Sequence, residues 1–133
     1  MHSLTHNPIL GHITTFGGHP VCCAAGMASF EKIIGEDLIA GIPEREAVIR
    51  TLQEMPEVEE VRGKGMLFAV EVGSFEEVIA VVHECLANGL VTDWFVHCDT
   101  AIRLAPPLTI TLEELKEGLE ILKSAIRTVK QSS

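Results

Sequence analysis

The sequence predicts an α+β fold in which helices pack on one face of a small, mainly antiparallel sheet. Helical spacing of apolar residues recurs in separate stretches of the chain, and short runs rich in β-branched residues lie between those stretches. In addition, 47% of the 133 residues are hydrophobic, which is enough to build a core. A sheet with helices on one face is the natural packing for this order of elements, which shows no internal repeat.

The first part of the chain predicts a loop followed by helices. Residues 1–19 are rich in Gly, His, Thr and Pro without any period, which is typical of a loop that needs a neighbour to pack on. A helix is expected from Pro20, because proline suits the first helical position and apolar residues follow at helical spacing. A second apolar stripe occupies 48–55. The pattern fits either two helices or one helix kinked at Pro43.

The middle of the chain predicts four strands. Residues 58–61 and 66–72 form the first pair, with a glycine-containing hairpin turn at 62–65 between them. Residues 90–95 and 101–105 are the next two strands.

Two further helices begin at capping boxes. Ser74 with Glu77 opens a helix that ends near residues 88–89, and Thr111 with Glu114 opens the last helix. The apolar residues of the last helix recur at steps of three and four, which predicts one core-facing stripe. Its members are Leu112, Leu115, Leu119, Leu122, Ile126 and Val129.

Charge and composition argue against several classes of protein. The net charge of −9 disfavours nucleic acid and anionic membranes as partners, because both require a concentrated positive face. No apolar run approaches the roughly 18 residues of a membrane span. The four cysteines form neither a CxxC pair nor a disulfide framework, so we expect a soluble protein of the reducing cytoplasm. No metal site is predicted, since His2 and His6 are the one histidine pair four residues apart and no helix supports it.

Three segments together resemble a known family. Residues 11–20 read Gly-His-Ile-Thr-Thr-Phe-Gly-Gly-His-Pro and precede an alanine-containing helix. A threonine before an aromatic residue, two glycines and a proline resembles the signature of the class III pyridoxal-phosphate-dependent aminotransferases. Residues 101–111 are similar to the closing strand of that family and the entry to its last helix, and residues 61–66 to its turn into the small-domain sheet. The order is the same and nearly the whole chain is covered.

The resemblance implies a domain assignment and an activity. Residues 1–19 would be the cofactor-phosphate loop at the end of a large domain, 20–55 connecting helices, and 56–133 the small C-terminal domain of a fold-type-I enzyme. The full-length protein would use pyridoxal 5'-phosphate to move an amino group from an amino or ω-amino acid to a 2-oxo acid, as acetylornithine, ornithine and 4-aminobutyrate aminotransferases do. Its partners would be its own large domain and the second subunit of a homodimer. An aminomutase of the same family and a non-catalytic α+β interaction module are the alternatives.

Thr14 and Thr15 are the candidate cofactor-binding residues. A threonine hydroxyl is a compact donor to a phosphate oxygen, and the adjacent glycines allow the backbone to approach closely. From the residues alone, the two hydroxyls would be ordinary turn formers. The resemblance implies that Thr15 reaches the cofactor phosphate of the neighbouring subunit.

Arg103 is the candidate substrate-binding residue. It is expected at the end of a strand with Ile102 and Leu104 on the opposite face, where its planar guanidinium could bind a carboxylate. The strand pattern fits a surface arginine in a weak ion pair equally well. The resemblance implies an active-site arginine that contacts a substrate carboxylate or an acidic side chain of the large domain. Arg62 and Lys64 are assigned to the hairpin turn.

The chain departs from the family pattern in two ways. His19 stands where the family usually has asparagine, a better N-cap, so the helix start is expected to be weaker or otherwise anchored. The resemblance also places the Schiff-base lysine upstream of Met1. None of the lysines of this chain lies in a matching context, so no catalytic residue is assigned here. The lysines are Lys32, Lys64, Lys116, Lys123 and Lys130.

Overall fold

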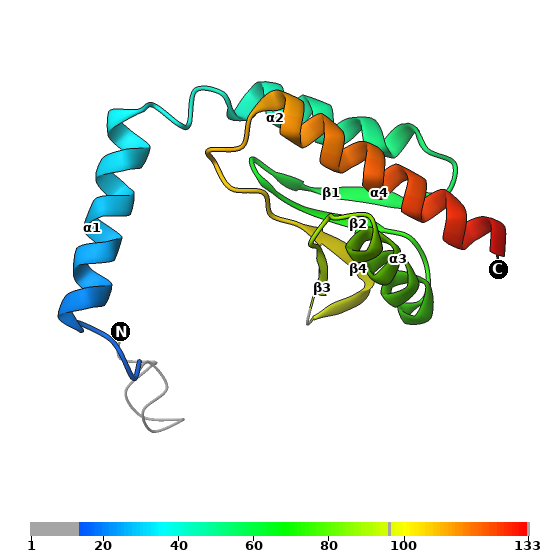
Figure 1. Ribbon diagram of the computed structural model, residues 1–133, viewed down its shortest axis with the longest axis horizontal. Coiled ribbons are helices and arrows are strands. Elements are labelled where there is room, and N and C mark those ends of the chain that lie inside the picture. Colours follow the sequence, from blue (N-terminus) through cyan, green and yellow to red (C-terminus); the bar gives the residue numbers. More distant parts are fainter. Residues whose placement is uncertain (1–13, 96, 133) are drawn as a thin grey trace, which may run out of the picture. The chain divides into compact units, whose positions relative to one another are not determined.

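The computed structural model describes residues 14–95 and 97–132, and it divides the chain into two compact units. The first unit, Met1–Asp37, contains one helix, α1 (Pro20–Gly35), which begins at the predicted proline. The second unit, Leu38–Ser133, contains every other element (Figure 1). These elements are α2 (Ile42–Arg50), the 3₁₀ helix η2 (Thr51–Glu54), β1 (Glu60–Lys64), β2 (Leu67–Glu71), α3 (Phe75–Ala87), β3 (Asp93–Phe95), β4 (Cys98–Leu104) and α4 (Leu112–Ser132).

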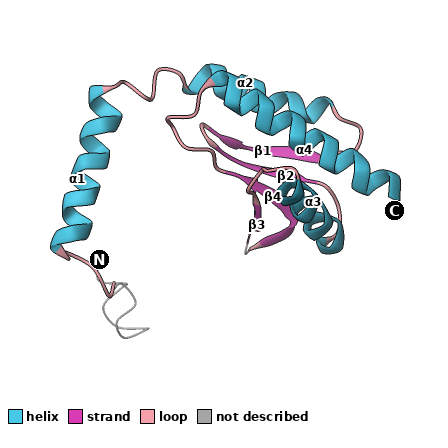
Figure 2. Cartoon of the chain, viewed as in Figure 1, coloured by secondary structure: helices cyan, strands magenta, loops and turns pink. Residues whose placement is uncertain are grey.

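The second unit is built on a four-stranded sheet with the strand order β1-β2-β4-β3. All three neighbouring pairs of strands are antiparallel, and Val70 of β2 lies opposite Ile102 of β4. Helices α3 and α4 pack against each other and α3 also packs on β4, while α2 lies beside α4 (Figure 2). The predicted α+β class, a small antiparallel sheet with helices on one face, is confirmed.

Alternation along the strands places the core between sheet and helices. Phe68, Val70 and Ile102 are fully buried, because they are on the face that the helices cover. Helix α4 meets them with its predicted stripe, of which Leu119 and Leu122 lie inside the core. The opposite face of the sheet carries mostly polar and charged residues. It is therefore the face of this unit that can present functional side chains.

The structure resolves the choice that the sequence left open around Pro43. Pro43 lies in the first turn of α2, so α1 and α2 are separate helices. The second compact unit begins at Leu38, and Ile49 of α2 and Leu52 of η2 are fully buried within it. The expected start of the small domain at residue 56 stays a prediction. The assignment of residues 1–19 to a large domain stays a prediction.

The first hairpin differs from the expected one. Arg62 and Lys64 lie within β1, and the turn consists of Gly65 and Met66, because Lys64 pairs with Leu67. The prediction of a turn at 62–65 was wrong. Gly65 has a φ of +66°, a left-handed conformation that glycine adopts at little cost. The two-residue connection moves both basic side chains onto the sheet.

Both predicted capping boxes are confirmed. The Glu77 carboxylate accepts from the Ser74 backbone N–H at 2.8 Å, and the Ser74 hydroxyl accepts from the Glu77 N–H at 3.3 Å. Thr111 and Glu114 make the equivalent reciprocal bonds at 2.9 and 3.2 Å. These local signals fix the starts of α3 and α4.

Candidate functional site

Thr14 and Thr15 begin a tight turn that leads into α1. The Gly17 N–H donates to the Thr14 carbonyl at 3.3 Å, which closes the turn. A Cβ added to Gly17 would contact the Thr14 hydroxyl, and Gly18 has a φ of +78°, a left-handed conformation that favours glycine. The two threonines are exposed, and neither hydroxyl bonds to another described residue. The turn therefore presents both hydroxyls for an external acceptor.

His19 anchors the start of α1 in place of the asparagine usual in the family. Its Nδ1 accepts a hydrogen bond from the Val21 N–H at 3.3 Å, and its ring meets the Phe16 ring edge-on with centroids 6.1 Å apart. The first turn of α1 contains no acidic residue. Exposed threonine hydroxyls beside a helix N-terminus free of negative side chains suit a phosphate, so these residues fit the phosphate group of the implied cofactor.

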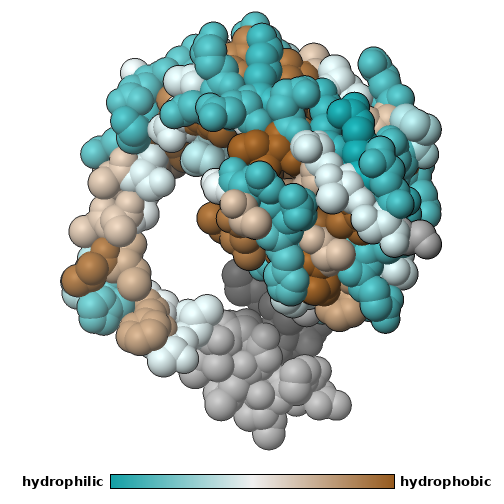
Figure 3. Space-filling view, turned by 45° about the vertical axis from the view of Figure 1, so that its right-hand side comes forward, coloured by the Kyte–Doolittle hydropathy of each residue, from teal (hydrophilic) through white to brown (hydrophobic). Residues whose placement is uncertain are grey.

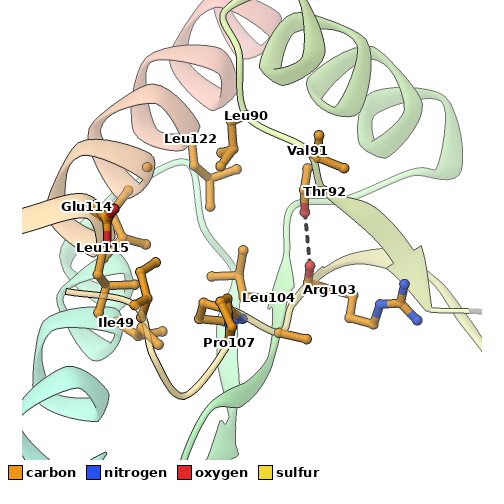
Figure 4. A pocket seen from close by; sticks show the side chains of 15 residues that line it. Ile49, Leu90, Val91, Thr92, Arg103, Leu104, Pro107, Glu114, Leu115 and Leu122 are labelled. Atoms are coloured by element: carbon orange, nitrogen blue, oxygen red, sulfur yellow. Dashed lines mark hydrogen bonds between the residues drawn. The ribbon is translucent and has the colours of Figure 1, made fainter. Parts of the chain in front are cut away.

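Arg103 lies on the polar face of the sheet near the end of β4. About 43% of its side chain is exposed, and its Nη2 lies 3.3 Å from Oδ2 of Asp93 on the adjacent β3. Asp93 and Arg103 are cross-strand partners in the antiparallel register. The guanidinium extends away from the helices that cover the other face (Figure 4). Its position allows it to contact a carboxylate that approaches this face.

Arg62 occupies the same face and differs in its bonding. One of its nitrogens bonds to both Glu60 and Glu71, and the other contacts the Cys98 sulfur at 3.4 Å. The pKa of Glu71 is lowered, first by the hydrogen bond from the Thr100 hydroxyl and then by Arg62. The Arg62 guanidinium is thus already paired with two carboxylates of this chain.

An apolar cavity of about 240 Å³ lies on the helix side of β4. Leu90, Leu104 and Leu122 face into it, whereas the Arg103 guanidinium points away from it (Figure 4). Glu114 at its edge is engaged in the cap of α4. Arg103 is also among the residues that line the cavity, so the cavity and the polar face meet at this residue.

Comparison with known proteins identifies the family. The family model for class-III aminotransferases matches residues 3–126. The chain belongs to this family. The acetylornithine aminotransferase of Caldanaerobacter subterraneus subsp. tengcongensis is 33% identical to this chain over 124 residues. The aligned part covers 90% of this chain and 31% of that enzyme. The chain thus spans about a third of the length of the relatives that it matches.

Solved structures of transaminases share the fold. A transaminase from work on directed evolution by ancestral reconstruction superposes with a TM-score of 0.77 at 32% identity, over 96% of this chain and 31% of that one. A Bacillus anthracis aminotransferase superposes with a TM-score of 0.74 at 28% identity, over 92% and 31%. The fold of this class-III chain is therefore that of a corresponding part of a transaminase.

The structure places the predicted site residues in two groups. Thr14 and Thr15 share the turn before α1 in the first unit, and Arg103 lies in the second. Sequence reasoning missed Asp93, although it lies in a run predicted as a strand. The one sequence feature that could have indicated Asp93 is its acidic side chain within an expected strand. The register that pairs it with Arg103 cannot be predicted from one strand alone.

Other site classes receive no support within the part of the chain that the structure describes. No helix there is both long and apolar enough to cross a membrane, and no group of three potential metal ligands is found. His2, His6 and residues 11–13 of the signature lie outside the described residues. All four cysteines are free, and burial raises the pKa of the Cys85 thiol to about 11.

Proposed function

We propose that this chain is the C-terminal part of a pyridoxal-phosphate-dependent aminotransferase that moves an amino group from an amino or ω-amino acid to a 2-oxo acid. The lysine that binds the cofactor lies, in this proposal, on a segment outside residues 1–133. The full-length protein is a homodimer in which Thr15 serves the site of the neighbouring subunit.

The exposed Arg103 guanidinium is the observation that carries the proposal. It lies on the polar face of the sheet with one carboxylate contact, and its other nitrogens bond to no described residue. A guanidinium with unfilled donors is suited to bidentate recognition of a carboxylate, the group that amino acids and 2-oxo acids share. The family membership explains why a carboxylate substrate would be expected at all.

The turn before α1 supplies the second element. Pyridoxal phosphate, when bound, provides the electron sink for amino-group transfer. In this proposal the Thr14 and Thr15 hydroxyls and the start of α1 hold its phosphate group. In this proposal the covalent lysine comes from a segment outside residues 1–133.

Substitution of Arg103 by lysine in the full-length enzyme tests the proposal. Lysine keeps the charge but loses the planar fork, so we expect kcat/KM for the amino donor to fall at least about ten-fold. The melting temperature should stay near that of the native enzyme, because Arg103 is exposed and the core is built by Ile102 and Leu104. Normal kinetics with a strongly lowered melting temperature would make Arg103 a structural residue and contradict the proposal.

The cofactor assignment has its own test on the isolated chain. Titration with pyridoxal phosphate followed by borohydride trapping should give no stoichiometric adduct on a single lysine. Scattered labelling below one equivalent would be nonspecific amine chemistry. A stoichiometric adduct on one lysine would show that the covalent partner lies within this chain.

The aminomutase alternative and the interaction-module alternative are separated by dependence on a 2-oxo acid. An aminotransferase requires a 2-oxo acid such as 2-oxoglutarate for turnover, and an aminomutase acting on an amino-aldehyde does not. An interaction module would bind no cofactor and show neither activity in the full-length protein.

A further inference from the structure

We infer that Asp93 is a positioning residue for Arg103: it holds one guanidinium nitrogen so that the remaining donors are directed toward a substrate carboxylate. The inference rests on the proposed role of Arg103 as the residue that contacts the substrate. It adds a second residue, on a different strand, on which the selectivity for carboxylates depends.

The geometry of the contact supports an orienting role. Asp93 of β3 and Arg103 of β4 are register partners, and Nη2 of Arg103 lies 3.3 Å from Oδ2 of Asp93. The other carboxylate oxygen, Oδ1, accepts the backbone N–H of Trp94 at 2.8 Å. This second bond fixes the direction of the carboxylate, so the Asp93 side chain is itself held before it contacts the arginine.

The short strand that carries Asp93 is attached on both sides. The Thr92 hydroxyl donates to the Arg103 carbonyl at 2.9 Å (Figure 4). The Trp94 ring packs edge-on against Phe75 at the start of α3, with ring centroids 5.9 Å apart. These contacts tie Asp93 to the strand of Arg103 and to a helix of the core. The backbone from which the Asp93 side chain extends is therefore held in place next to Arg103.

The contrast with Arg62 shows what one carboxylate leaves free. An arginine offers five N–H donors in a rigid fork. Arg62 bonds through Nη1 to Glu60 and Glu71 and through Nη2 to the Cys98 sulfur, whereas the Arg103 side chain bonds, among the described residues, to Asp93 alone. The two arginines on this face of the sheet thus differ in how many N–H donors remain unbonded. Arg103, which has a single carboxylate partner, can bind a second carboxylate.

Stability does not account for the Asp93 contact. Both side chains are nearly half exposed, at 43% for Arg103 and 48% for Asp93, and exposed ion pairs contribute little to folding because water screens them. Such a pair still restricts the directions in which a long side chain points. Orientation is therefore the effect expected from this contact.

The test compares Asp93→Ala with Asp99→Ala in the full-length enzyme. Asp99 is an exposed residue of β4, and its removal makes the same change in net charge. Two experiments are made: steady-state kinetics gives KM and kcat for the amino donor, and calorimetry gives the Kd of glutarate, a dicarboxylate that cannot react. For Asp93→Ala we expect KM and Kd to rise about five- to ten-fold, while kcat stays within about two-fold of the native value. For Asp99→Ala we expect no change in any of these quantities, because only Asp93 limits the directions of the Arg103 side chain.

Two further variants decide whether Asp93 acts through Arg103. Asp93→Asn keeps an acceptor oxygen in place and should recover part of the lost affinity, and it replaces Asp93→Ala if that variant does not fold. On an Arg103→Ala background, Asp93→Ala should add no further loss, since the group that it positions is gone. An additive loss, or equal effects of Asp93→Ala and Asp99→Ala, would overturn the inference while leaving the role of Arg103 intact. An Arg103→Ala enzyme with unchanged KM and Kd would instead refute the proposed role of Arg103, and the inference with it.

Discussion

Helices α1 and α4 show that apolar content and burial are different properties. Most residues of α1 are apolar or small, yet none of them is buried, and Val21, Met27 and Phe30 are each more than half exposed. Figure 3 shows apolar residues at the surface of this helix. α4 is far more polar along its length and buries five residues. Its apolar residues form one stripe that meets the sheet, whereas α1 presents apolar side chains without a core in its own unit.

Truncation of one phenylalanine in each region should give the largest difference. Phe68 in β2 is fully buried, and Phe30 in α1 is 62% exposed. Phe68→Ala should reduce the free energy of unfolding of the isolated chain by about 3–5 kcal/mol, because it removes apolar burial and leaves a cavity. Phe30→Ala should change it by less than about 0.5 kcal/mol. Urea unfolding monitored by circular dichroism measures both.

The same experiment can show whether α1 is exposed in solution. If Phe30→Ala destabilises the isolated chain by several kcal/mol, then α1 is buried in solution and its exposed face is not free. Repeating the measurement over a range of protein concentrations separates burial within one chain from burial between copies, since only the latter depends on concentration.

Local signals in the sequence predicted the parts of the fold that local chemistry determines. The capping boxes at Ser74 and Thr111 and the stripe of α4 depend on side chains three or four residues apart, and all were confirmed. The hairpin was misplaced because Arg62 and Lys64 alternate with glycines, which resembles a turn in isolation. Pairing with β2 extends β1 through them. Tertiary pairing overrode the local pattern there.

The sequence predicts single residues for the site but not the contacts that they make. Thr14, Thr15 and Arg103 were identified by resemblance, and their roles stay predictions. Asp93 could not be found, because its pairing with Arg103 depends on an antiparallel register and on an irregularity between Trp94 and Phe95 that shifts it. A one-residue change of register would have placed Asp93 on the other face.

The first unit, in which none of the described residues 14–37 is buried, should matter for the cofactor more than for stability. In the full-length enzyme, Thr15→Val is expected to weaken retention of pyridoxal phosphate by about 1.5–3 kcal/mol, the value of one hydrogen bond to a charged group. The rate of the chemical step should change less, because the phosphate is remote from the reacting carbon. Cofactor affinity is measured by equilibrium dialysis and the chemical step by single-turnover kinetics. Unchanged affinity would make Thr15 a turn residue only.

Glycine substitutions should have opposite signs in the two regions. A Cβ at Gly63 in β1 would lie 2.3 Å from the Leu67 carbonyl oxygen and 2.6 Å from the Phe68 ring, so Gly63→Ala should cost about 1–3 kcal/mol of stability. Gly26 in the middle of α1 has no neighbour within 4 Å of such a Cβ, and Gly26→Ala should favour the helix by up to about 1 kcal/mol. Far-ultraviolet circular dichroism reports the helix, and urea unfolding reports the stability. A destabilising Gly26→Ala would indicate that another surface lies close to α1.

The smallest expected effect concerns two ion pairs, one in each region, and their dependence on pH. Glu77 bonds to Lys130 at 2.7 Å and joins the start of α3 to the end of α4, with 22% and 27% of the side chains exposed. The hydrogen bond from Lys130, and after it that from the Ser74 backbone, lower the pKa of Glu77 from 4.5. A lowered folded-state pKa contributes stability above the unfolded pKa and loses it as the pH falls through the folded one.

Native chain and Glu77→Gln should therefore differ by a constant amount, under about 1 kcal/mol, near neutral pH, and the difference should shrink below about pH 4.5. The matched variant is Glu36→Gln, which breaks the 2.6 Å pair with Lys32 in α1, where both side chains are more than half exposed. That variant should leave the free energy of unfolding nearly unchanged at every pH, because water screens the pair and α1 contributes nothing to the core. Urea unfolding between pH 3 and 7, expressed as differences from the native chain, distinguishes the two. A difference for Glu77→Gln that does not depend on pH would mean that its carboxylate acts through packing and not through charge.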